Sequence, residues 1–147
     1  MTLHTSRGQA DHSSYVAAVR QDIETQGISL TDVRIGVSPE GRREAFMRLE
    51  PGDSTSLGQP LLEASIRWDE EHGWSFLARY DTVPLLRGSP LYKGLGVLPD
   101  PDDVAVWVVA LLANPAMIPS REDGPYRLCS SADPAFNAQL TRYSFGQ

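Results

Sequence analysis

The sequence predicts an α+β protein in two layers, with an antiparallel sheet of four to five strands packed on one face against two main helices. Three observations predict this fold. Residues 61–80 alternate apolar and polar side chains on both sides of a five-residue polar turn, which is typical of a β-hairpin. Residues 13–26 have the spacing of an amphipathic helix, and residues 101–113 begin with aspartates that favour a second helix. The expected order is helix, strands, helix, in one domain over residues 13–114.

The first helix is expected to follow a disordered leader over residues 1–12. Ser13 or Ser14 can cap its start, and Gly27 can end it in the left-handed conformation. Its apolar side chains recur at helical spacing on one side: Tyr15, Val16, Val19 and Ile23. The other side is polar, so one face of this helix is expected to be buried.

The first two strands come next. Val33, Ile35 and Val37 alternate with polar residues or glycine, which predicts a half-buried strand over residues 33–37. A turn over residues 38–42 leads to a second strand over residues 44–49. Residues 50–60 are rich in glycine, serine and proline, which indicates a loop.

The hairpin over residues 61–80 supplies strands three and four. Its register is strongly specified, because a slip of one residue would move the apolar side chains to the other face. The expected pairs on the apolar face are Trp68 with Trp74, Ile66 with Phe76, Ala64 with Ala78, and Leu62 with Tyr80. On the other face, Glu63 is expected opposite Arg79 as a favourable charge pair.

The turn of this hairpin, Asp69-Glu70-Glu71-His72, contains side chains that bind metal ions. A divalent ion needs ligands that converge, whereas neighbouring side chains in a tight turn point apart. We therefore interpret the turn as a solvated hairpin tip and predict no metal site.

The connection over residues 81–99 is rich in glycine and proline, which predicts an irregular crossing with one short extended piece. Within it, Arg87, Lys93, Gly94 and Gly96 could present cations and backbone N–H groups to an anion. Residues 87–96 are therefore the best candidate for a ligand-binding loop. The simpler interpretation is that the glycines let the chain turn beside the hairpin.

The second helix has a strong start signal, with Asp100 as N-cap and Pro101 at the first helical position. Residues 104–113 are apolar all round, and a helix of this kind must be covered on both sides. The sheet would cover one side, and either residues 115–147 or a second copy of the protein would cover the other. Residues 115–147 are too apolar for a free tail, so we expect them to pack on the domain or on a partner, with a short helix near 134–143.

The composition limits the function classes. A net charge of -6 argues against general electrostatic binding to nucleic acid or anionic lipid. The longest apolar run has ten residues, about half of a membrane span. Cys129 is the single cysteine, which excludes an internal disulfide and fits the cytoplasm. We find no reactive constellation, so we predict no catalytic residue and no cofactor.

Three segments together resemble a known family: Tyr15-Val-Ala-Ala-Val, Trp68-Asp-Glu-Glu-His-Gly-Trp74, and Gly96-Val-Leu-Pro-Asp-Pro-Asp-Asp-Val-Ala. The chain is similar, over about residues 13–114, to small actinobacterial proteins known only as a domain of unknown function. The resemblance implies the helix–strands–helix order and no catalytic residues. The order also resembles that of type III secretion chaperone-like domains, which bind other proteins and often dimerise.

Two hypotheses of function follow. The first is a non-catalytic cytoplasmic interaction or adaptor module that binds itself, as a homodimer, or another protein. Its interface would include five residues: Trp107, Val106, Val109, Trp68 and Trp74. The second is a protein that binds a small phosphate-containing metabolite, or an enzyme, using residues 87–96 with Arg34, Arg67 or Arg79 on the outer face of the sheet.

Overall fold

The computed structural model describes residues 11–50, 55–56, 59–80, 90–113, 118, 120 and 125–145. The elements in chain order are α1 (Ser13–Thr25), β1 (Ser29–Val37), β2 (Arg43–Glu50), β3 (Thr55–Ser56), β4 (Gln59–Asp69), β5 (Gly73–Tyr80), β6 (Leu91–Tyr92), α2 (Pro101–Ala113) and α3 (Pro134–Phe145). The predicted α+β class and the order helix, strands, helix are confirmed, with α3 following as a third helix.

The strands form one antiparallel sheet in the order β1-β2-β4-β5-β6, and the short β3 pairs with the start of β4. The hairpin register is confirmed at Trp68–Trp74 and at the three pairs that follow it: Ile66–Phe76, Ala64–Ala78 and Glu63–Arg79. The predicted pairing of Leu62 with Tyr80 is wrong. The register shifts between Leu61 and Glu63, so Tyr80 pairs with Leu61. An irregularity of this kind gives no signal in an alternating pattern.

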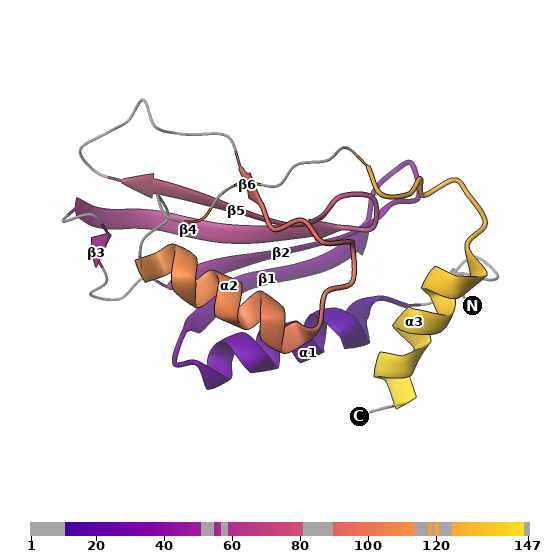
Figure 1. Cartoon of the computed structure of the whole chain (residues 1–147), viewed down its shortest axis with the longest axis horizontal. Coiled ribbons are helices and arrows are strands. Elements are labelled where there is room, and N and C mark those ends of the chain that lie inside the picture. Colours follow the sequence, from indigo (N-terminus) through magenta and orange to yellow (C-terminus); the bar gives the residue numbers. More distant parts are fainter. Residues whose placement is uncertain are drawn as a thin grey trace.

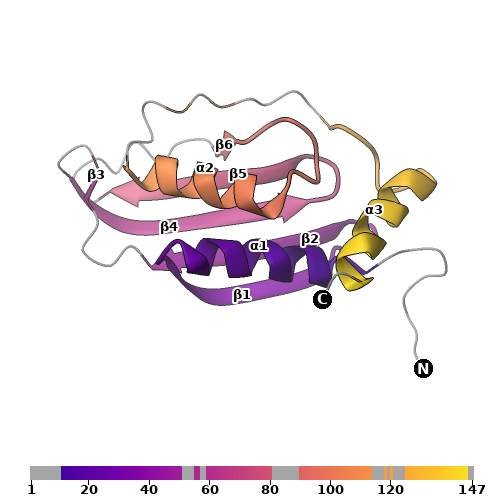
Figure 2. The same ribbon diagram turned by 60° about the horizontal axis from the view of Figure 1, so that its bottom comes forward.

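Both α1 and α2 lie side by side on one face of the sheet, as Figures 1 and 2 show, and together they enclose the core. The buried side chains come from alternate positions of β2, β4 and β5 and from one side of each helix, as the periodicities predict. The largest of these are Trp68, Trp74, Tyr15 and Phe76. The other face of the sheet is not covered by any helix of the described residues.

Strand β1 corrects one expectation. It begins at Ser29, four residues before the predicted start at Val33, and it forms the edge of the sheet. Ile35 and Val37 alternate as predicted, but they are 41% and 58% exposed. Their positions pair with Ala45 and Arg43 near one end of β2. A residue at an edge has a neighbouring strand on one side only, so alternation alone does not ensure burial.

The start of α1 also differs from the prediction. His12, placed in the predicted leader, is the N-cap residue of α1 and is buried. The side chain of His12 makes no capping hydrogen bond, and neither Ser13 nor Ser14 is the N-cap residue that we predicted. Instead Asp11 accepts hydrogen bonds from the backbone N–H and the hydroxyl of Ser13. Residues 1–10 of the predicted leader lie outside the described residues.

The C-terminal helix α3 packs on its own domain, against the N-terminal end of α1 (Figure 2). Phe136 and Leu140 are buried in the same core as the sheet and the other two helices. Tyr143 makes an edge contact with Tyr15, with 5.0 Å between the ring centroids. The predicted helix near 134–143 therefore forms, as residues Pro134–Phe145, and it does not cover the exposed side of α2 described below.

Candidate functional site

The two tryptophans of the hairpin are held by hydrogen bonds to segments far away in the sequence. The indole Nε1 of Trp74 donates to the Tyr15 hydroxyl at 3.1 Å, and this hydroxyl donates to the carbonyl oxygen of Pro99 at 2.7 Å. The Nε1 of Trp68 donates to the carbonyl oxygen of Val97 at 2.7 Å. Burial raises the pKa of Tyr15, so its hydroxyl keeps its proton and donates. The interface role predicted for Trp68 and Trp74 is not supported, because both indoles are enclosed in the core of the chain itself.

The described part of the candidate ligand loop packs tightly on the hairpin. The N–H of Lys93 donates to the carbonyl oxygen of Trp74. Gly94, Leu95 and Gly96 all have positive φ angles. A Cβ at Gly73, where φ is +81°, would stand 2.7 Å from the carbonyl oxygen of Gly96. Gly73 therefore allows the close approach of the two backbones, and the positive φ angles of Gly94 and Gly96 let the loop turn beside the hairpin, which is the simpler of the two interpretations. Arg87 lies outside the described residues.

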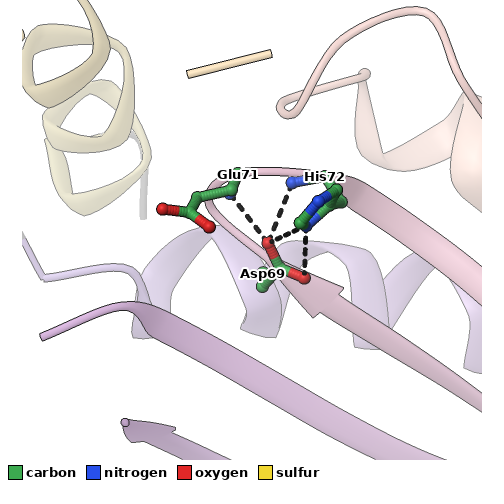
Figure 3. Close-up of side chains that lie close together, drawn as sticks. All are labelled: Asp69, Glu71 and His72. Carbon is green, nitrogen blue, oxygen red and sulfur yellow. Dashed lines mark hydrogen bonds and ion pairs between the residues drawn. The ribbon is translucent and has the colours of Figure 1, made fainter. Parts of the chain in front are cut away.

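The hairpin turn brings Asp69, Glu71 and His72 together, with possible metal-ligating atoms within 4.8 Å of one another (Figure 3). Asp69 Oδ1 accepts hydrogen bonds from the N–H groups of Glu71 and His72, both at 2.8 Å, and pairs with the His72 ring. Glu71 Oε2 accepts the N–H of Cys129 at 2.8 Å, and this bond lowers the pKa of the Glu71 carboxyl. The carboxylates of Asp69 and Glu71 therefore stabilise the backbone of the turn, and a metal ion would have to compete with these hydrogen bonds.

The turn is not the solvated tip that we predicted. Glu70 is almost fully buried, between the guanidinium groups of Arg43 and Arg127. Its Oε1 accepts a hydrogen bond from Arg127, and its Oε2 accepts the backbone N–H of Arg43 at 2.6 Å. Both guanidinium groups also lie over the Phe136 ring of α3, 5.3 Å and 4.1 Å from its centroid. A buried carboxylate needs opposite charges close to it. Here the two arginines that pair with Glu70 also contact Phe136, and so they attach α3 to the hairpin.

The outward side of α2 carries an apolar strip. Val106 is 61% exposed and Val109 is 38% exposed. Trp107 is half-buried, with its ring set edge-on to Phe76 at 6.4 Å between centroids. The indole N–H of Trp107 is the one polar side-chain group within residues 104–113, so Val106 and Val109 offer water no hydrogen-bonding group. Val106 and Val109, predicted as interface residues, lie on this strip.

The outer face of the sheet holds the arginines that the sequence placed there. Arg34, Arg67 and Arg79 line one hollow with a volume of about 650 Å³, and so does Arg48. Lys93, Gly94 and Gly96 are not among the residues that line it. The described part of the loop instead contacts the backbone of the hairpin at Trp74 and Gly73. The structure thus separates the two parts of the predicted ligand site.

The comparisons with known proteins agree with the resemblance of the three segments. The family of unknown function DUF6292 matches residues 15–110. The chain belongs to this family. No curated protein and no solved structure matches the chain. None of the described helices is long and apolar enough to cross a membrane.

The part of the chain that matches DUF6292 runs from Tyr15 to Ala110 and so includes the sheet and most of α2. Both candidate surfaces, the strip on α2 and the hollow on the sheet, lie within it. Arg127 and α3 lie outside it. Sequence reasoning missed the buried charges Glu70 and Arg43, because partners 57 residues apart, such as Arg127 and Glu70, leave no pattern in the sequence.

Proposed function

We propose that this member of DUF6292 is a non-catalytic interaction module of the cytoplasm that forms a homodimer through the outward side of α2. One observation carries the proposal. Val106 and Val109 are exposed on a helix that has no charged side chain over residues 104–113. Full burial of an exposed valine contributes about 1.5–3 kcal/mol. Covering the exposed fractions of Val106 and Val109 contributes part of that for each, so a second copy on the strip gains stability without burying a charge.

The distribution of charge favours a second copy over a different partner. The strip is uncharged, and the exposed acids of the helix, Asp102 and Asp103, lie at its start. In a dimer with two-fold symmetry, two copies of α2 that run antiparallel place these acidic starts at opposite ends of the contact. The like charges are then separated, while the apolar centres face one another.

The hydrogen bonds described above support a binding role over catalysis. In the hairpin turn, the carboxylates of Asp69 and Glu71 accept hydrogen bonds from backbone N–H groups, and His72 pairs with Asp69. In the described part of the predicted ligand loop, Gly94 and Gly96 have positive φ angles that let the chain turn beside the hairpin. Chemical groups that hold the fold in this way are not poised to react with a substrate.

The test is the mass of the protein in solution, measured by sedimentation velocity and native mass spectrometry. We expect a dimer for the unchanged chain and folded monomers for Val106→Asp and Val109→Asp, with native circular dichroism. Val37→Asp is the matched control, because Val37 is also exposed, at 58% against 61% for Val106, but lies on the edge strand β1.

Three results would contradict the proposal. The unchanged chain could be a monomer at high micromolar concentration. Val37→Asp could dissociate the dimer while Val106→Asp leaves it intact, which would place the interface at the edge of the sheet. A different polypeptide could remain bound through α2 when the protein is isolated gently from its host, which would replace self-association with a heteromeric contact.

A further inference from the structure

The outer face of the sheet is hollowed across four strands. The hollow has a volume of about 650 Å³ and is lined from β1, β2, β4 and β5. Its lining residues Phe46, Arg67 and Leu77 alternate with buried residues along the same strands, so the hollow is on the face opposite the core. No described helix covers this face (Figure 1), and the hollow is therefore independent of the strip proposed for dimerisation. Adjacent strands lie about 4.8 Å apart, so the hollow is wide enough for a polypeptide segment to lie across it.

An aromatic ring between two arginines forms the centre of this hollow. Phe46 of β2 pairs in register with Arg34 of β1 on one side and with Arg67 of β4 on the other. The guanidinium carbons of these arginines lie over the Phe46 ring, 5.5 Å and 5.4 Å from its centroid. Stacking of this kind holds a guanidinium group by its plane and leaves its N–H edge available to an acceptor.

The charges around the ring do not balance. Arg34 pairs with Asp32 at 2.9 Å, and Arg48 and Arg79 share Glu63, at 3.4 Å and 3.2 Å. Arg67 forms no ion pair with any residue that the structure describes. Four guanidinium groups are thus accompanied by two carboxylates, in a chain whose net charge is -6.

Two other carboxylates at the rim of the hollow keep their negative charge, but their hydrogen bonds and ion pairs are with groups other than the four arginines. Glu44 pairs with Arg42 at 2.9 Å, and Asp69 accepts the N–H groups of the hairpin turn. Arg67, which has no ion-pair partner among the described residues, therefore lies in the hollow beside two apolar side chains, Phe46 and the exposed Leu77. Arginine and aromatic residues are enriched at the centres of protein interfaces.

We propose that this face binds an acidic segment of a partner polypeptide. Its carboxylates accept hydrogen bonds from Arg67 and from the free N–H groups of Arg34, and its apolar side chains rest on Phe46 and Leu77. A nucleic acid fits less well, because bases bind by stacking on an open ring and the Phe46 ring is flanked by two guanidinium groups. A small molecule fits less well, because the hollow is about half open to solvent, whereas pockets for small molecules bury most of the ligand surface.

The probe for the test is a fluorescein-labelled decapeptide of alternating glutamate and leucine, followed by fluorescence anisotropy with the full chain at low salt. We expect saturable binding that weakens at least about 10-fold in Arg67→Gln, the loss that corresponds to one charge-assisted hydrogen bond. Phe46→Leu is expected to weaken binding as well, because the guanidinium groups lose the ring on which they stack. The same peptide with lysine in place of glutamate is expected not to bind.

Arg20→Gln is the matched control. It removes the same charge from the exposed side of α1, where Arg20 pairs with Glu24, and leaves the hollow intact. Equal weakening by Arg20→Gln and Arg67→Gln, or no binding of the acidic peptide, would overturn the proposal. So would tighter binding of an oligothymidine probe or of inorganic pyrophosphate, which would assign the face to a nucleic acid or a small anion. Binding that persists in the monomeric Val109→Asp variant is expected, and it separates this proposal from that of the dimer.

Discussion

The Trp74 indole and the Tyr15 hydroxyl, 59 residues apart in the sequence, are joined by a buried hydrogen bond of 3.1 Å. The same hydroxyl donates to the carbonyl oxygen of Pro99, just before α2. One side chain thus connects α1, the hairpin and the start of α2. Tyr15, Trp74 and Pro99 all lie within residues 15–110, the part of the chain that matches the family.

Removal of that hydroxyl should destabilise the protein without opening a large cavity. We expect Tyr15→Phe to lower the free energy of unfolding by about 2 kcal/mol, because the Trp74 N–H and the Pro99 carbonyl both lose their partner in a buried site. Urea denaturation followed by tryptophan fluorescence measures the change. Tyr126→Phe, at a more exposed tyrosine, is the control and should stay within about 0.5 kcal/mol of the unchanged chain.

The close approach of Gly73 to Gly96 predicts a graded series of glycine substitutions. Gly73→Ala should cost about 3 kcal/mol, because alanine meets both a positive φ and the carbonyl oxygen of Gly96. Gly41→Ala should cost about 1 kcal/mol, because Gly41 has a similar φ of +91° but no described atom within 4 Å of its Cβ position. Equal losses in thermal denaturation would show that the close approach adds nothing to the strain of the φ angle.

The buried carboxylate of Glu70 predicts how α3 is attached. Glu70→Gln should lower the free energy of unfolding by about 3 kcal/mol, because the buried guanidinium group of Arg43 and the partly buried one of Arg127 lose the anion between them. Hydrogen exchange should increase in α3 more than in α1, since the contacts through Phe136 depend on both arginines. Glu24→Gln, in an exposed pair with Arg20, should change little. Uniform loss of protection across the chain would contradict a specific role in holding α3.

The environment of His12 predicts a dependence on pH. The imidazole stacks on Trp68, with 5.5 Å between the ring centroids, and its Nε2 hydrogen-bonds to the carbonyl oxygen of Glu44. Burial lowers the pKa of His12 below the ordinary value of 6.5, so the folded state favours the neutral ring. The unfolded chain then binds more protons than the folded chain. The stability from this group is therefore present above about pH 6.5 and is lost as the pH falls.

This pH effect is measured by urea denaturation at a series of values from neutral to about pH 5. His12→Gln should show a shallower loss of stability over this window than the unchanged chain, because glutamine has no proton to gain. Equal slopes for the two proteins would mean that His12 is protonated alike in the folded and unfolded states. Comparison of slopes, rather than of stabilities at one pH, removes the constant cost of the substitution itself.

Much of the fold follows from local patterns in the sequence. The hairpin register at Trp68–Trp74 was predictable because side chains on a strand alternate with a period of two, which leaves one register that puts the apolar set on one face. The helix over Pro101–Ala113 was predictable because an aspartate followed by proline matches the geometry of a helix start. The outward position of the arginines on the sheet also follows from these patterns, since the period of a strand determines which side chains share a face. The exposure of Val106 does not follow, because residues 104–113 are apolar all round and no pattern marks an outward side.

The tertiary structure decided the burial of those side chains whose surroundings come from distant parts of the chain. Ile35 is exposed because β1 is the edge strand, and the position of a strand in a sheet is a property of the whole chain. His12 and Glu70 are buried because Trp68, Arg43 and Arg127 reach them across long separations in sequence. The sequence by itself determined the elements and their faces through local sterics and the period of hydrophobic residues. Only the packed structure placed the buried charges and the hollow around Phe46, because long-range contacts arise once the elements have come together.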